Sequence, residues 1–108
     1  GNLSLSRMMI DFLLKNGDIA LRFTPNFKYG TVVLTSAKGG QWATDGKTLS
    51  IDPFKRKTRF EVAFTRDHCA FQIYVDGTHY ATFPHRFPPS EIVRIQVQWM
   101  NNIDIQIK

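Results

Sequence analysis

The stretch Asp18-Ile19-Ala20-Leu21-Arg22-Phe23-Thr24-Pro25-Asn26-Phe27 decides how this chain folds. Successive side chains of a β-strand point to opposite faces, so Leu21 and Phe23 are expected to face a core. The polar side chains of the opposite face are Arg22, Thr24 and Asn26. The stretch therefore predicts a strand that presents a polar row on one surface of a sheet.

The same period of two recurs along the chain, and each apolar set predicts a strand with one buried face. These sets are Phe60, Val62 and Phe64; Cys69, Phe71, Ile73 and Val75; Val93, Ile95, Val97 and Trp99; and Ile103, Ile105 and Ile107. Turn sequences such as Asp76-Gly77 recur about every 8 to 12 residues, which fits a sandwich or barrel. A short helical turn is expected between Pro88 and Glu91. The sequence thus predicts an all-β domain, with Trp99 in its core.

Length and composition limit the class of protein. The chain has 108 residues, of which 43% are hydrophobic and 13% aromatic, so residues 1–108 are expected to form a single domain. We expect no membrane insertion, because no apolar run approaches the roughly 18 residues that a span needs. Cys69 is the one cysteine and cannot form an internal disulfide. Its presence suits a cytoplasmic protein, or one exported to the extracellular space without a signal peptide.

The chain is basic, with 14 Lys and Arg against nine Asp and Glu and a net charge of +5. Four positive charges lie in the run Lys55-Arg56-Lys57-Thr58-Arg59. Such a run can bind a polyanion such as heparin or RNA. It also fits a solvated turn, which is the interpretation that we favour.

Catalysis finds little support in the sequence. His68 and Cys69 are adjacent on an expected strand, so their side chains should point to opposite faces and cannot form a nucleophile–base pair. The chain has no Cys-x-x-Cys, no metal-binding histidine spacing, no phosphate-binding glycine loop and no nucleophile elbow. We therefore expect no enzyme, no cofactor and no metal.

Three features together resemble the galectin family: the stretch 18–27, Trp42, and the segment Tyr80-Ala81-Thr82-Phe83-Pro84-His85-Arg86. In that family a strand ends in His-x-Asn-Pro-Arg, the next contributes an Asn, and a Trp-Gly-x-Glu-x-Arg strand closes a β-galactoside site. The resemblance extends from about Arg7 to Lys108. It implies an antiparallel β-sandwich of jelly-roll topology and a non-enzymatic lectin. It also implies that the family's N-terminal strand is absent, which would leave a sheet edge uncovered.

The resemblance assigns the carbohydrate-binding positions to Arg22, Thr24, Asn26, Thr35, Trp42, Asp45 and Lys47. Of these, the tryptophan alone keeps the family's residue type, and its ring could stack on the apolar face of a pyranose. Asn26 is shorter than the family's Arg, and Thr24 has one hydroxyl where an amide would stand. Each unmade polar contact costs about 1–3 kcal/mol, while a millimolar ligand binds with only about 4 kcal/mol. We therefore expect weak or changed glycan specificity.

Other interpretations of these residues remain open. Trp42 also fits a surface aromatic, Arg22 and Asn26 fit solvated strand residues, and Asp45 and Lys47 fit pairs with neighbouring charges. His85-Arg86 is expected to be structural. At the level of function, the alternatives to a glycan or glycoprotein partner are two. One is a lectin-fold protein-interaction module, including a homodimer through sheet edges, and the other is a polyanion binder using residues 55–59.

Overall fold

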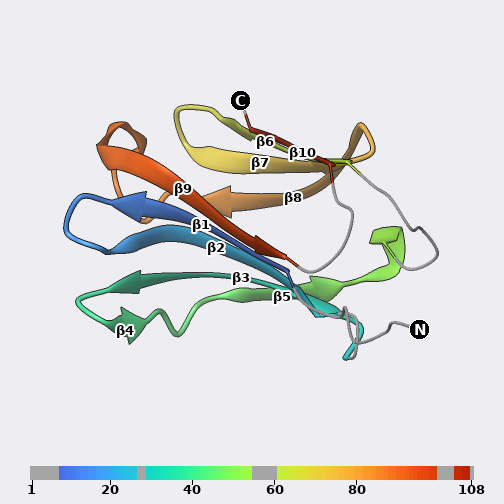
Figure 1. Cartoon of the computed structure of the whole chain (residues 1–108), viewed down its shortest axis with the longest axis horizontal. Coiled ribbons are helices and arrows are strands. Elements are labelled where there is room, and N and C mark those ends of the chain that lie inside the picture. Colours follow the sequence, from blue (N-terminus) through green and yellow to red (C-terminus); the bar gives the residue numbers. More distant parts are fainter. Residues whose placement is uncertain (1–7, 27–28, 55–60, 100–103, 108) are drawn as a thin grey trace.

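The protein is described by a computed structural model that covers residues 8–26, 29–54, 61–99 and 104–107. Within these residues it forms two packed sheets (Figure 1). The six-stranded sheet has the order β4 (Gln41–Trp42), β3 (Thr31–Lys38), β2 (Ile19–Asn26), β1 (Met8–Leu14) and β9 (Ile92–Trp99), with β5 (Lys47–Ser50) also paired to β3. The four-stranded sheet has the order β10 (Asp104–Ile107), β6 (Glu61–Arg66), β7 (Ala70–Val75) and β8 (Thr78–Pro84).

The predicted all-β sandwich is confirmed, with two local differences. Pairing between described strands is antiparallel except for β10, which runs parallel to β6. The expected helical turn occurs at Pro89–Glu91, but a second turn, at Asp52–Phe54, was not predicted. In that turn the Phe54 N–H donates to the Ile51 carbonyl at 2.8 Å, and both side chains are buried. The turn thereby inserts an additional phenylalanine into the core.

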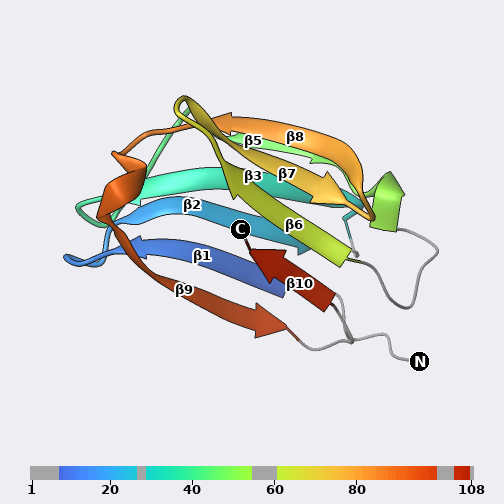
Figure 2. The same ribbon diagram turned by 90° about the horizontal axis from the view of Figure 1, so that it is seen from above.

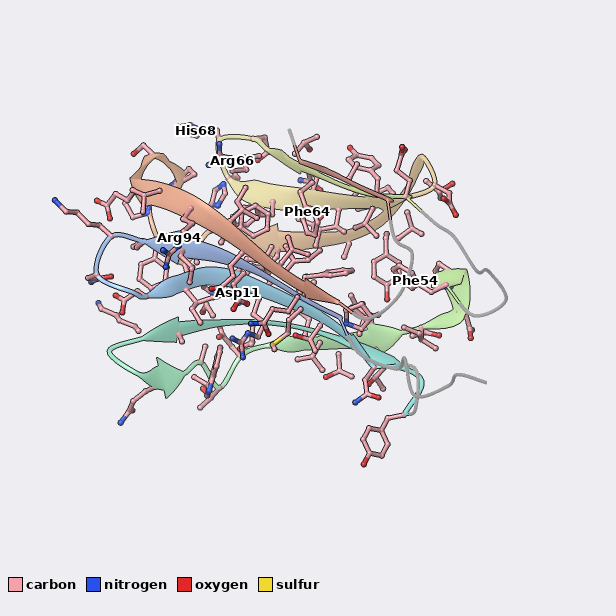
Figure 3. All side chains as sticks on the ribbon, in the orientation of Figure 1. Asp11, Phe54, Phe64, Arg66, His68 and Arg94 are labelled. Atoms are coloured by element: carbon pink, nitrogen blue, oxygen red, sulfur yellow. The ribbon has the colours of Figure 1, made fainter. Side chains whose placement is uncertain are left out.

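Phenylalanine rings hold the two sheets together. Phe64 of β6 lies 5.1 Å from Phe12 of β1 and 5.3 Å from Phe23 of β2, measured between ring centroids. Both contacts are edge-to-face, an arrangement worth about 0.5–1.5 kcal/mol beyond area burial. Figure 3 shows Phe64 between the two sheets. Leu21 and Phe23 are fully buried, as the alternation of β2 predicted, so the polar row of this strand faces away from the core.

Two residues of one predicted apolar face, on β9, are not buried as expected. Val93 is 63% exposed and Ile95 is 37% exposed. Ile95 pairs with Phe12 and therefore points to the core side of its sheet. However, β9 is an edge strand, and it lies along the outer margin of the sandwich (Figure 2). The alternation therefore predicted the face correctly, but it could not show that little of the facing sheet covers it.

The prediction of a strand through His68 and Cys69 was wrong. The strand begins at Ala70, and both residues are exposed in the turn between β6 and β7. The Asp67 carboxylate caps this turn by accepting from the Cys69 N–H at 2.8 Å. The structure does not describe the side chains of Trp99, of the basic run 55–59, or of Phe60, Ile103, Ile105 and Ile107. The predictions made for these residues therefore lie outside the described part of the chain.

The aromatic contact between the sheets leads to a stability prediction. We expect Phe64→Ala to lower the free energy of unfolding by about 3–5 kcal/mol, because it removes the ring that touches Phe12 and Phe23 and leaves a cavity. Urea unfolding followed by circular dichroism measures the change. Val93→Ala is the control, since an exposed position should change stability by less than about 0.5 kcal/mol. Equal losses in the two variants would contradict this assignment of the core.

Candidate functional site

A groove of about 400 Å³ lies on the outer face of the six-stranded sheet. Its floor is built by cross-strand neighbours of β2 and β3, where Arg22 lies opposite Thr35 and Asn26 opposite Thr31. Such pairs point to the same face of a sheet, so the polar row of β2 continues onto β3. The full lining is Arg22, Thr24, Asn26, Tyr29, Thr31, Val33, Thr35 and Trp42. The groove therefore brings together five of the predicted site residues: Arg22, Thr24, Asn26, Thr35 and Trp42.

Arg22 is fixed in place by a carboxylate on the neighbouring strand. Asp11 of β1 lies directly opposite Arg22 in the strand register. The Nε and Nη2 atoms of Arg22 donate to Oδ1 and Oδ2 of Asp11, each at 2.7 Å. This bidentate geometry is the strong form of an arginine–carboxylate pair. The side-chain hydrogen bond to Asp11 also raises the pKa of Arg22 above its ordinary value.

The same guanidinium covers a face of Trp42. The Cζ atom of Arg22 lies 4.6 Å from the centroid of the indole, within the range of a cation–π interaction. Trp42 is 48% exposed overall, but the ring face that meets Arg22 is occupied. A sugar cannot stack on that face unless Arg22 moves. Because Asp11 holds the guanidinium at two points, that movement also breaks the ion pair.

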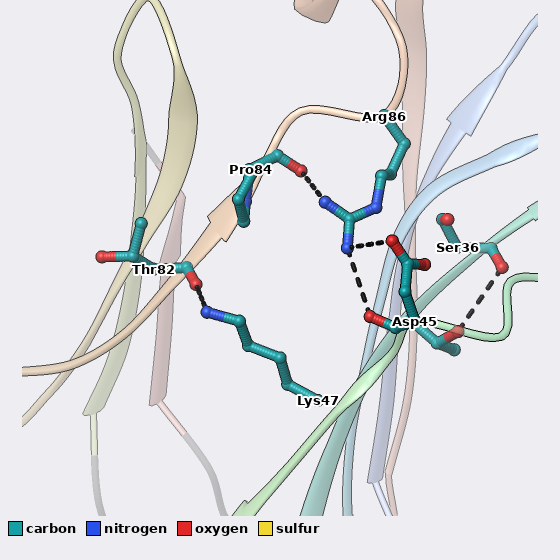
Figure 4. Close-up of polar contacts among 7 residues, drawn as sticks. Ser36, Asp45, Lys47, Thr82, Pro84 and Arg86 are labelled. Atoms are coloured by element: carbon teal, nitrogen blue, oxygen red, sulfur yellow. Dashed lines mark hydrogen bonds and ion pairs between the residues drawn. The ribbon is translucent and has the colours of Figure 1, made fainter.

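Asp45 and Lys47 lie outside the groove, and both contact the four-stranded sheet or the segment that follows it (Figure 4). The Asp45 carboxylate accepts from Nη2 of Arg86 at 3.1 Å. The Lys47 ammonium donates to the carbonyl of Thr82 in β8 at 2.7 Å. Asp45 therefore pairs with a neighbouring charge, as one of the interpretations expected, whereas Lys47 contacts a backbone carbonyl instead of a charged group. These contacts hold the residues on either side of Gly46 against β8 and the segment that follows it.

Arg86 makes several of the contacts that hold this segment. Its Nη1 donates to the Pro84 carbonyl at 3.0 Å, its Nη2 donates to the Asp45 carbonyl at 3.3 Å, and its guanidinium lies 4.4 Å from the Phe83 ring centroid. The segment it holds follows directly on Trp42. The Ala43 N–H donates to the Ser36 carbonyl at 2.9 Å, which ties this segment to β3. Arg86 is therefore a positioning residue for the strand that carries Trp42, in line with its expected structural role.

Gly46 allows the segment to lie close to β3. A Cβ atom at this position would come within 2.8 Å of the Leu34 carbonyl oxygen and 3.2 Å of the Thr35 side chain. Real Cβ atoms essentially never approach a backbone oxygen this closely, so any other residue would push β5 away from β3. The glycine thus sets the path that takes Lys47 toward β8.

Several residues that line or support the groove were missed from sequence. Thr31 and Val33 lie four and two residues before Thr35 on the same strand, so their side chains point to the same face. A stricter use of the two-residue period would therefore have found them. Asp11 belongs to another strand, and its role depends on the register between β1 and β2. Tyr29 belongs to the turn after β2. Nothing in the local sequence indicates that its ring lines the groove.

Residues 2–107 match the family model described as galactoside-binding lectin. The chain belongs to the galectin family. It is 34% identical over 92 residues to a 32 kDa β-galactoside-binding lectin of Haemonchus contortus, an alignment that covers 85% of this chain and 32% of that protein. It is 36% identical over 89 residues to grifin of Rattus norvegicus, covering 82% of this chain and 61% of that protein.

The likeness extends to solved galectin structures. Galectin LEC-6 of Caenorhabditis elegans superposes with a TM-score of 0.73 at 26% identity, covering 86% of this chain and 64% of that chain. This galectin domain spans about a third of the length of the Haemonchus lectin, as the 32% coverage shows. Membership of a family of lectins confirms the resemblance, the sandwich fold and the assignment as a non-enzymatic protein.

The described residues form no metal-binding cluster and no membrane-spanning helix. Among them, no three His, Cys, Asp or Glu side chains gather closely enough to bind a metal ion. None of the described helical turns is long and apolar enough to cross a membrane.

The Arg86 contacts generate a prediction about the galectin groove. We expect Arg86→Ala to increase amide exchange of Ala43 roughly tenfold, because the loss of about 1–1.5 kcal/mol of contacts loosens the segment. Hydrogen exchange followed by nuclear magnetic resonance measures this change. Arg66→Ala is the matched control, since Arg66 also donates to a backbone carbonyl, that of Pro89 at 3.2 Å, without touching Asp45. Unchanged exchange at Ala43 in Arg86→Ala would exclude the positioning role.

Proposed function

We propose that this chain is a galectin-type carbohydrate-binding domain whose altered β-galactoside site binds lactose weakly or not at all. The observation that carries the proposal is Arg22, which is clamped by Asp11 and lies over Trp42. Further support comes from Thr24, Asn26, Thr35 and Trp42, which line the same groove as Arg22, while Asp45 and Lys47 lie outside it. The partner is a glycan or glycoprotein, with a specificity that differs from that of a typical galectin.

The free energy needed to displace Arg22 supports a changed specificity and argues against an intact lactose site. A cation–π contact is worth about 0.5–2 kcal/mol, and a ligand that stacks on the covered face of Trp42 must replace it. The ligand must also compensate for breaking a bidentate ion pair whose Asp11 side chain is only 11% exposed. A millimolar ligand has about 4 kcal/mol of binding free energy in total. The combined cost is a large share of that amount.

The second candidate function is a protein-interaction module that uses the lectin fold. The exposed apolar residues Val93 and Ile95 on the edge strand β9 favour it, because an uncovered strand edge can pair with another chain. A homodimer through sheet edges remains a prediction of this alternative. Polyanion binding by residues 55–59 and cytoplasmic or exported localisation also remain predictions.

Restoring the family residues tests the altered site. We expect the triple variant Arg22→His, Thr24→Asn and Asn26→Arg to bind lactose at least tenfold more tightly than the parent, a gain of about 1.4 kcal/mol. The reason is that the variant removes the guanidinium from the face of Trp42 and restores the family's polar side chains at the three positions. Isothermal titration calorimetry gives both dissociation constants.

The matched control keeps Arg22 and changes only Thr24→Asn and Asn26→Arg. This double variant should gain little, because the guanidinium still covers the indole. Adding Trp42→Ala to the triple variant should remove its gain. Lactose binding by the parent that is as tight as in the triple variant would contradict the proposal.

A further inference from the structure

We infer that the ligand contact in this groove has moved along β2 and β3, from Trp42 to Tyr29, and that the groove takes a neutral glycan with a pyranose ring on Tyr29. The inference rests on the proposed lectin function and specifies its ligand and its stacking residue. It begins from the shape of the groove, which has an aromatic ring at each end. Trp42 follows the Thr35 end of the floor, while Tyr29 follows the end formed by Asn26 and Thr31.

The two ends differ in how exposed their aromatic side chain is. At the Trp42 end, Arg22 occupies the indole face and is held there by Asp11. At the opposite end, Tyr29 is 72% exposed. Asn26 stands there at the position where the galectin pattern places the long side chain of an arginine. The substitution of a short amide for that arginine leaves space in front of the Tyr29 end.

Tyr29 belongs to a turn that is held by several backbone contacts. Its N–H donates to Oδ1 of Asn26 at 3.2 Å, and the Gly30 N–H donates to the Asn26 carbonyl at 2.9 Å. Gly30 has a φ of +72°, a left-handed conformation that glycine adopts without strain. The Ile51 N–H donates to the Gly30 carbonyl at 3.1 Å, which joins the turn to the end of β5. The backbone that carries the Tyr29 ring is therefore held in place before a ligand binds, which lowers the cost of ligand binding.

The length of the groove fits an oligosaccharide that runs along the strands. Arg22 and Asn26 are four residue steps apart along β2, which corresponds to about 13 Å on a β-strand. The groove volume of about 400 Å³ lies within the range of small-ligand pockets, about 300–1,000 Å³. Small side chains form the floor between the two ends. The Thr31 hydroxyl can contact sugar hydroxyls, whereas the hydroxyl oxygen of Thr24 is buried.

The charge of the groove favours a neutral ligand. Among the groove-lining residues that the structure describes, Arg22 alone carries a charge, and Asp11 neutralises it through two 2.7 Å contacts. A sulfated or sialylated glycan would find no unpaired cation among these lining side chains. The hydroxyl and amide groups of the floor instead suit uncharged sugars.

The test uses ¹⁵N-labelled protein and four neutral disaccharides as probes: lactose, N-acetyllactosamine, cellobiose and maltose. We expect at least one to shift the amide resonances of Tyr29, Gly30 and Thr31 more than the indole N–H of Trp42. Tyr29→Ala should weaken that binding roughly tenfold, because it removes an aromatic stacking surface. Tyr29→Phe should lose less affinity than Tyr29→Ala, since it keeps the ring. Val93→Ala, at an exposed position outside the groove, is the control that should bind as the parent does.

The outcomes separate this inference from the function on which it rests. If a neutral disaccharide binds but loses affinity in Trp42→Ala and not in Tyr29→Ala, the chain is a lectin and the move to Tyr29 is wrong. If sulfated lactose binds and none of the four neutral probes does, the neutral ligand class is wrong. Weak sugar ligands call for probe concentrations of about 10 mM. If no probe, neutral or sulfated, shifts any amide at this concentration, the lectin function itself is contradicted. Circular dichroism of each variant verifies that it is folded.

Discussion

The edge-to-face contact of Phe64 with Phe12 and Phe23 is the interaction on which the site depends. It joins the middle of one sheet to two adjacent strands of the other, and so decides which face of β1 and β2 lies inside. Because side chains alternate along a strand, the same contact places Asp11 and Arg22 on the opposite face. The groove is therefore a consequence of the core, built by the residues that alternate with its phenylalanines.

The Asp11–Arg22 pair shows how a single charged residue can reshape a binding surface. An arginine on an open sheet would normally be mobile and solvated. Here a carboxylate on the next strand meets its guanidinium at two points, and the indole of Trp42 receives its flat face. The three groups stabilise one another, so one end of the groove is filled by the protein itself. The tryptophan of the galectin pattern is thus kept, and Arg22 occupies one of its faces.

The opposite sheet and the segment that follows it also shape the groove, through residues outside its lining. Arg86 and the Thr82 carbonyl hold the segment around Gly46 by contacts with Asp45 and Lys47. This segment connects the strand that carries Trp42 to β5. The position of Trp42 thus depends on contacts across the open side of the sandwich, and substitutions there can alter binding at a distance.

Much of this structure was determined by the sequence alone, because the deciding pattern is local. Alternation in residues 19–26 specifies a strand with a buried and a polar face, and the family resemblance specifies the sandwich and five residues of the groove. Tertiary structure decided the rest. The exposure of Val93 and Ile95 depends on the edge position of β9, which alternation does not encode. The pairing of Arg22 with Asp11, eleven residues away, and of Asp45 with Arg86, forty-one residues away, depends on strand register and on the packing of two sheets. Such contacts join distant parts of the chain, so their geometry exists only once the sheets have assembled.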